Sequence, residues 1–328
     1  MKKHILDVKQ MRTSFQSNKG RVEAIRGIDL HVNEGEILGI VGESGSGKSV
    51  TMKSVTGLLP TYAKVESEGI MYKDVDLSKL SEKELQKYRG KEIAMIFQDP
   101  MTAMNPLRKV GYHLTQVIRR YKKCSKAEAE KLGIEMLAQV GIPTPEVRMK
   151  QYPHEFSGGM RQRALIAMAL SCEPSLLIAD EPTTALDVTI QAQILELLKK
   201  LHDERNMSIV IISHDMGVMA NMCDRIVVMY GGIIVEEGTV DEIFYHSKHP
   251  YTKALLKSIP HTEHARGEKL VGIDGAPPSL YQLPKGCPFA ERCEFATEKC
   301  KEMMPEFKNY SETHKAKCLL DMTEGKVD

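Results

Sequence analysis

The sequence predicts an α/β fold in which helices cover a mainly parallel sheet. One observation is a glycine-rich phosphate-binding loop that follows an apolar run and precedes a stretch able to form a helix. A second is the alternation of short apolar runs with longer helical patterns. A third is that polar side chains follow several of these runs. The carboxyl ends of parallel strands are where such sheets bind ligands.

The phosphate-binding loop runs from Gly42 to Ser49 and follows the apolar run at residues 37–41. Its glycines let backbone N–H groups turn toward phosphate oxygens, and the start of the next helix adds positive partial charge. Lys48 is placed to reach the β- and γ-phosphates, and the Ser49 hydroxyl to bind Mg²⁺. A chance glycine-rich turn is the alternative, but it does not explain the strand–loop–helix context. The candidate nucleotide-binding positions are Gly42, Ser44, Gly45, Ser46, Gly47, Lys48, Ser49 and Val50.

Composition describes an ordinary soluble protein with room for one large domain and a smaller one. The net charge of +1 gives no general field for binding polyanions, and the absence of Trp disfavours a base-stacking surface. No apolar run approaches the roughly 18 residues that span a bilayer. The basic start is interrupted by Asp7 and Lys9 before a signal peptide forms. We therefore expect a cytosolic protein with reduced thiols and no nucleic-acid partner.

Three later strand candidates end in polar groups that have chemical uses. They lie at about 92–97, 175–181 and 208–215, and the polar groups at their carboxyl ends are Gln98, the pair Asp180 and Glu181, and His214. Buried strands rarely end in paired acids without a cation, which favours a metal-binding role over a solvated turn. His214 alone is also compatible with a surface histidine. Phe15, upstream of the loop, is either a base-stacking residue or a packing residue.

Between these strands the pattern changes to helices. Amphipathic helices at about 111–121 and 126–140 predict a helical subdomain over about 100–165. Ser157, Gly158 and Gly159 then open another helix, a second candidate anion-binding terminus. Past residue 238 the composition shifts, and the sequence predicts a helix over 240–246 that His249-Pro250-Tyr251 would end. We place the domains at 1–245 and 246–328.

Taken together, these residues resemble the nucleotide-binding subunit of an ATP-binding-cassette (ABC) transporter. Gly42–Ser49 resembles Walker A, Gln98 the Q-loop and Leu176–Glu181 Walker B. The other matches are Ser157–Gln162 with the signature motif (here S-G-G-M), Ala185–Asp187 with the D-loop and His214 with the H-loop. The resemblance implies a P-loop NTPase cassette with a mainly parallel sheet, N-terminal antiparallel strands, a helical subdomain and a small cysteine-rich C-terminal extension.

The tail narrows the resemblance. Residues 249–256, 275–278 and 283–293 resemble the C-terminal extension of oligopeptide and dipeptide importer ATPases. The implied function is an ATPase subunit that powers peptide uptake through two membrane permeases, at the cytoplasmic face of the membrane. An extracytoplasmic peptide-binding protein would act indirectly. A nickel-importer ATPase and a soluble, non-transport ABC ATPase are the alternatives.

The same resemblance implies a role for each motif residue. Glu181 would activate the attacking water as general base, and His214 would contact the γ-phosphate and orient that base. Gln98 would contact the metal or the water, and Asp180 would hold the Mg²⁺ shell with Ser49. Ser157, Gly158 and Gly159 would contact ATP held by an identical or paralogous ATPase subunit, with Asp187 at the junction. The membrane subunit would dock near Met101 to Arg108.

The tail also carries four cysteines, Cys287, Cys293, Cys300 and Cys318. Unrelated thiols, disulfides and a metal site are the possible interpretations, and a cytosolic location disfavours disulfides. The spacing lacks the paired C-x₂-C arrangement of common zinc sites and the compact ferredoxin run. The identity of the metal therefore does not follow from spacing. The family resemblance implies a [4Fe–4S] cluster with one thiolate from each cysteine.

Overall fold

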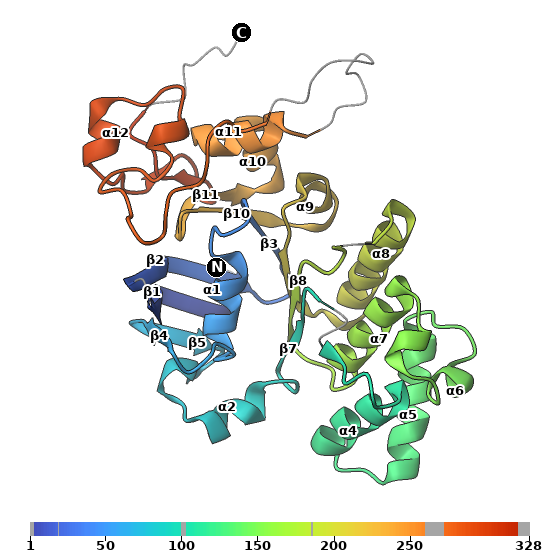
Figure 1. Cartoon of the computed structure of the whole chain (residues 1–328). Helices are drawn as coiled ribbons and strands as arrows, with labels where there is room; N and C mark the ends of the chain where they lie inside the picture. The colour runs from blue at the N-terminus through green and yellow to red at the C-terminus, as the bar shows by residue number, and fades with distance from the viewer. Residues whose placement is uncertain (1–2, 19, 100–102, 185, 260–271, 321–328) are drawn as a thin grey trace. The chain divides into compact units, whose positions relative to one another are not determined.

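The computed structural model describes residues 3–18, 20–99, 103–184, 186–259 and 272–320. The chain divides into two compact units, and each is described by itself. The helical unit comprises residues 1–5, 33–35 and 79–212, and the P-loop unit comprises residues 6–32, 36–78 and 213–328. Figure 1 labels the helices and strands of both.

A parallel sheet forms the core of the helical unit. Strand β8 (Leu176–Asp180) lies between β7 (Ile93–Ile96) and β9 (Ser208–Ile212), and both pairings are parallel. Every residue of β8 and β9 is buried. Unbroken apolar runs are typical of strands covered on both faces, so the three predicted strands are confirmed.

Helices of the helical unit pack around α7 (Gly158–Leu170). Both α4 (Val110–Lys122) and α5 (Lys126–Gln139) contact α7 and each other, and Figure 1 shows them side by side. On α4 the buried Val110, Leu114 and Ile118 recur every fourth residue, which places them on one face. These two helices are confirmed within one residue of their expected bounds. The remaining helical elements are α2 (Glu82–Tyr88), α6 (Pro145–Arg148), η2 (Pro153–Glu155) and α8 (Val188–Arg205).

Two sheets build the P-loop unit. In one, β10 (Arg225–Tyr230) pairs in parallel with β3 (Ile37–Val41) and antiparallel with β11 (Ile233–Thr239). β11 continues to the short tail strands β13 (Lys315–Ala316) and β12 (Lys308–Asn309). The other sheet has the order β2-β1-β5-β6, with β4 also paired to β1. Its bounds are β1 (His4–Ser17), β2 (Gly20–Asn33), β4 (Ala63–Glu66), β5 (Gly69–Tyr72) and β6 (Val75–Asp76).

The helices of the P-loop unit are short. They are α1 (Lys48–Val55), η1 (Leu77–Lys79), α9 (Met216–Met222), α10 (Val240–His246), α11 (Pro250–Lys257), η3 (Ala290–Arg292) and α12 (Glu298–Glu302). The expected helix over 240–246 is confirmed. The end of that helix before His249-Pro250-Tyr251 is also confirmed, but a second helix begins within this segment, which the sequence did not predict. Pro250 opens α11, because proline suits the first helical turn, and His249 Nδ1 accepts the N–H of Tyr251 as its cap.

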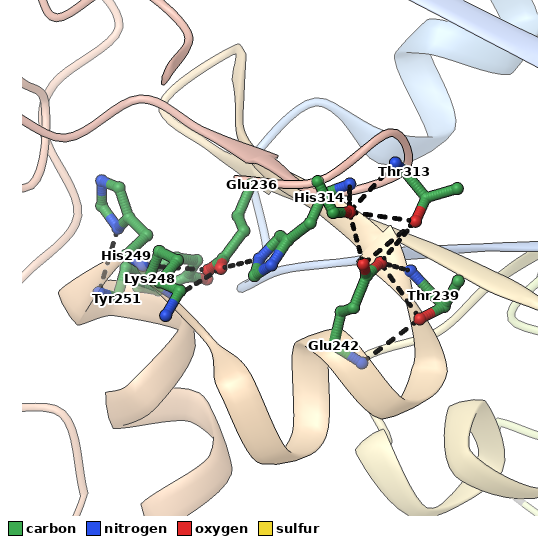
Figure 2. A network of polar contacts seen from close by, with 9 residues as sticks. Glu236, Thr239, Glu242, Lys248, His249, Tyr251, Thr313 and His314 are labelled. Atoms are coloured by element: carbon green, nitrogen blue, oxygen red, sulfur yellow. Dashed lines mark hydrogen bonds and ion pairs between the residues drawn. The ribbon is translucent and has the colours of Figure 1, made fainter. Parts of the chain in front are cut away.

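Buried polar contacts fix the tail onto this unit, as Figure 2 shows. Glu236 on β11 is fully buried and accepts hydrogen bonds from the backbone N–H groups of Lys248 (2.5 Å) and His249 (3.0 Å). Its carboxylate also lies 2.8 Å from Nε2 of the buried His314 in the tail. Removing one partner of such a buried group is costly, so this contact specifies where the tail docks.

Candidate nucleotide-binding and hydrolysis site

The backbone of the phosphate-binding loop has conformations that only glycine adopts easily. Gly42 and Gly47 have φ of +151° and +104°. A Cβ at Gly42 would lie 2.1 Å from the carbonyl oxygen of Met229, and one at Gly47 would lie 2.7 Å from Ile25 Cδ1. At Gly45 (φ +80°), in contrast, a Cβ would meet nothing within 4 Å. The loop is therefore packed at both ends and open at its centre, as a cradle for an anion requires.

Polar groups line this cradle. Lys48 is buried, and its ammonium donates to the carbonyl oxygens of Gly42 (2.7 Å) and Glu43 (3.0 Å). Ser46 Oγ is buried and has no hydrogen-bond partner within the part of the chain that the structure describes. No acidic residue occupies the first turn of α1. A lysine, an unsatisfied hydroxyl and a helix N-terminus without an acid fit a phosphate group.

In the helical unit, Gln98 and Glu181 meet. Gln98 Nε2 donates to Glu181 Oε2 at 2.9 Å, and Thr184 Oγ1 donates to the same oxygen at 2.8 Å. Glu181 follows the fully buried Asp180 at the end of β8, and its N–H donates to the carbonyl of Ile212. Its φ of +47° is uncommon for a residue with a side chain, and such conformations cluster at functional sites. Two hydrogen bonds thus fix this carboxylate, and a third fixes the backbone of Glu181.

Sequence reasoning missed Thr184. A hydroxyl three residues after a candidate general base was the signal that could have identified it. The neighbouring Asp187 accepts the N–H of Ile190 at 2.9 Å and caps α8. Ala185, the first D-loop residue, lies outside the described residues.

The signature segment forms an exposed helix start. Ser157 is the N-cap of α7, where its hydroxyl accepts the N–H of Met160 at 3.3 Å. Ser157 and Gly158 are exposed, and Gly159 is half-buried. A Cβ at Gly159 would lie 2.7 Å from Ile190 Cγ2 on α8, so only glycine allows this close approach. The helix terminus is thereby presented at the surface of the helical unit.

The remaining predicted residues lie in the P-loop unit. His214 is exposed, and the preceding Ser213 donates its N–H to the carbonyl of Ile40 on β3 at 3.2 Å. Phe15 is half-buried, with its ring 6.2 Å from the exposed ring of Tyr62. Ser44 is exposed, and Ser49 and Val50 are half-buried on the loop and the first turn of α1.

The four tail cysteines are all free thiols. The N–H of Cys287 donates to the carbonyl of Cys300 at 2.7 Å. Burial, reinforced by the thiols of Cys318, Cys293 and Cys300, raises the pKa of Cys287 to about 11. Among the described residues, however, no three His, Cys, Asp or Glu side chains are arranged to hold a metal ion. The expected iron–sulfur site is therefore not supported by the structure.

No helix in the described part of the chain is both long and apolar enough to cross a membrane.

Comparisons with known proteins identify the family. Residues 25–184 match the model of the ABC transporter family, and residues 235–300 match that of the oligopeptide/dipeptide transporter C-terminal region. The oligopeptide transport ATP-binding protein OppD of Bacillus subtilis is 54% identical, with 96% of this chain and 88% of that protein covered. The dipeptide transport ATP-binding protein DppD of the same organism is 52% identical over 96% and 94%.

A solved structure supports the fold. The dimeric ATP-binding cassette MJ0796, bound to ADP and phosphate after hydrolysis, has a TM-score of 0.63 and 28% identity, covering 72% of this chain and 98% of its own. Motifs, fold and relatives agree, and the chain belongs to the ATP-binding proteins of the oligopeptide and dipeptide ABC transporter family.

Proposed function

We propose that this chain is the ATP-hydrolysing subunit of an ABC importer and powers the uptake of dipeptides or oligopeptides. The observation that carries the hydrolytic part is the carboxylate of Glu181, held by Gln98 and Thr184 directly after a buried strand. The substrate class rests on the tail, which matches a region specific to peptide transporters. The alternatives, a nickel importer or a soluble non-transport ATPase, are not favoured by these relatives.

The chemistry follows from the residues in each unit. Lys48 and the loop N–H groups would bind the triphosphate, and Glu181 would take a proton from the water that attacks the γ-phosphorus. The bond to the bridging oxygen then breaks, giving ADP and phosphate. Ser49 and Asp180 offer the oxygen ligands that suit Mg²⁺, which neutralises phosphate charge when it is bound. Gln98 would orient the water, and His214 would contact the γ-phosphate.

A second subunit would complete each site. Ser157, Gly158 and Gly159 present an exposed helix N-terminus, a suitable partner for phosphate held by another cassette. Asp187 at the start of α8 would lie at the junction. The dimeric form of the related cassette structures supports this arrangement. The partner is an identical or a paralogous ATPase subunit.

The membrane permeases would dock on the helical unit. A hollow of about 540 Å³ there is lined by residues from α4, α5 and the segment before α4. Leu107 is 82% exposed at its edge, and Arg108, Tyr112 and Tyr152 also line it. An exposed apolar residue beside aromatic rings suits a short amphipathic helix of a permease. Met101, part of the expected docking segment, lies outside the described residues. The chain would thus act at the cytoplasmic face of the membrane.

Two finer assignments remain proposals. The domain boundary after residue 245 separates the cassette from the extension, and the helical subdomain spans about 100–165.

A [4Fe–4S] cluster on Cys287, Cys293, Cys300 and Cys318 rests on the family resemblance alone. Purification without oxygen tests it, because iron and sulfide in a four-to-four ratio per chain would support the cluster. Zinc alone, or four freely alkylated thiols, would exclude it.

Membrane purification and reconstitution test the proposed function. The tagged chain, isolated from membranes, should bring along two permeases and a second ATPase subunit. Proteoliposomes of that complex, supplied with a peptide-binding protein, should accumulate labelled dipeptide or oligopeptide only with ATP. Uptake of nickel but not of peptide would establish the runner-up function, and a chain without membrane partners would point to a soluble ATPase.

A further inference from the structure

An arginine of the C-terminal tail forms an ion pair with a residue of the phosphate-binding loop. Arg292 closes η3, and its Nη1 and Nη2 donate to the two carboxylate oxygens of Glu43 at 2.6 Å and 2.9 Å. Glu43 is the second residue of the loop, 249 positions away in the sequence. The Arg292 side chain is only 5% exposed and that of Glu43 is 25% exposed, so this two-bond ion pair is largely shielded from water. Bidentate, shielded pairs of this kind are the strong ones.

Every side of the guanidinium is held. Its Nε donates to the carbonyl of Asp274 (2.8 Å), and Nη2 also donates to that of Ile273 (3.0 Å). Nη1 also donates to the Tyr230 hydroxyl at 3.0 Å. A Cβ at Gly275 (φ +81°) would lie 3.3 Å from Arg292 Cγ, so the tail backbone passes close to the aliphatic part of the Arg292 side chain. With these partners the arginine has one position and acts as a fixed cation.

The other end of the contact is the group that binds phosphate. The carbonyl of Glu43 accepts from Lys48 Nζ at 3.0 Å and from the N–H of Ser46 at 3.2 Å. The N–H of Glu43 donates to the Tyr251 hydroxyl at 2.8 Å. A single residue thus joins the tail arginine to the loop lysine.

Aromatic side chains pack beside the contact between Arg292 and Glu43. The rings of Tyr230 and Tyr251 lie 4.5 Å apart, and Phe289 from the tail lies 5.3 Å from each. All three side chains are buried. Such aromatic pairs add to the free energy of packing beyond the area they bury. The tail therefore packs close to the loop, and the ion pair lies beside closely packed, buried side chains.

We infer that Arg292 is a positioning residue for nucleotide binding, which acts by neutralising and holding Glu43. ATP brings three to four negative charges to a loop that carries its own carboxylate. With Arg292 in place, the negative charge of Glu43 is compensated. The main chain of Glu43 then stays where Lys48 and the loop N–H groups meet the phosphates. The tail is then part of the nucleotide-binding apparatus. This inference rests on the proposed binding of ATP at Gly42–Ser49.

Opposite charge changes at the two ends of the pair separate this role from a merely structural one. Arg292→Gln leaves the Glu43 carboxylate uncompensated, so the Kd and KM for Mg-ATP should rise by about 5- to 20-fold, with kcat within about twofold. Glu43→Gln removes the negative charge from the loop and leaves Arg292 uncompensated, so the Kd for Mg-ATP should fall by about 2- to 5-fold. The double variant Glu43→Gln/Arg292→Gln should return to within about twofold of the original affinity. The Arg292→Gln penalty should shrink as salt is raised.

The measurement uses the full chain and a fluorescent ATP analogue, with thermal unfolding recorded for each variant. Arg89→Gln is the matched control, because Arg89 makes a two-bond pair with Glu82 at 2.7 Å and 3.0 Å in the helical unit. It should leave affinity unchanged. If both single variants and the double variant unfold earlier but bind ATP equally well, the pair is only structural and the inference is overturned. If Lys48→Ala still binds ATP normally, the proposed nucleotide site itself is wrong, which is a separate outcome.

Discussion

Gln98 and Glu181, 83 positions apart in the sequence, meet through a 2.9 Å hydrogen bond from the amide nitrogen of one to the carboxylate of the other. Gln98 lies just after the end of β7, and Glu181 directly follows β8. Parallel strands end at the same edge of a sheet, so the register of β7 and β8 brings these side chains together. A carboxylate oriented this way is suited to accept a proton from one particular water.

Replacing Glu181 by Gln should therefore separate binding from hydrolysis. The amide keeps the size of the side chain but accepts no proton, so the rate of ATP hydrolysis should fall by about 10²- to 10⁴-fold. The affinity for Mg-ATP should be retained, because the loop at Gly42–Ser49 is untouched. Single-turnover phosphate release and equilibrium nucleotide binding measure the two quantities. Turnover at the original rate would rule out Glu181 as the general base.

Thr184 gives a second, milder test of the same carboxylate. Thr184→Val removes the hydroxyl that donates to Glu181 Oε2 and nearly keeps the shape. The hydroxyl fixes the orientation of the general base, so its loss should lower kcat by about tenfold. KM for ATP should stay within about twofold. Thr184→Ser keeps the donor and is the control. Equal losses in both variants would mean that loss of the hydroxyl does not explain the effect.

The residues that sequence reasoning found and those it missed differ in how local their signals are. The loop at Gly42–Ser49 and the cap at Ser157 are specified by neighbours in sequence, because glycine conformations and helix starts are local. Arg292 was missed because its partner Glu43 lies 249 positions away and nothing nearby marks the pair. The end of α10 before His249 was predicted, but the start of α11 at Pro250 was not. Proline suits the first turn of a helix as well as a break, and the hydrogen bond from the His249 N–H to the buried Glu236 is not visible in the local sequence.

Ser157 should act on the nucleotide of a partner subunit. Ser157→Arg places a large cation at an exposed helix start, where a closely apposed cassette would meet it. In mixed dimers with one altered signature, the site completed by that signature should lose hydrolysis, and the other should retain most of its own. Site-specific trapping of a photoreactive ATP analogue distinguishes the two. Full activity from dilute, strictly monomeric chains would contradict the composite site.

His249 should make the P-loop unit sensitive to acid. Burial lowers the pKa of His249 to about 4, although the nearby Glu236 carboxylate opposes this, and Nδ1 accepts the Tyr251 N–H only when unprotonated. Because the folded pKa lies below the unfolded value near 6.5, the unfolded chain binds the proton more tightly. The contribution of neutral His249 to the free energy of unfolding is complete above pH 6.5 and declines as pH falls toward 4, by up to about 3 kcal/mol.

His249→Asn keeps an acceptor that does not titrate, so this variant should lose less stability than the original chain between pH 7.5 and 5 in thermal or denaturant unfolding. His246→Asn, at an exposed histidine three residues earlier, should follow the original chain. If His249→Asn has the same pH dependence as the original chain, His249 does not supply this acid sensitivity.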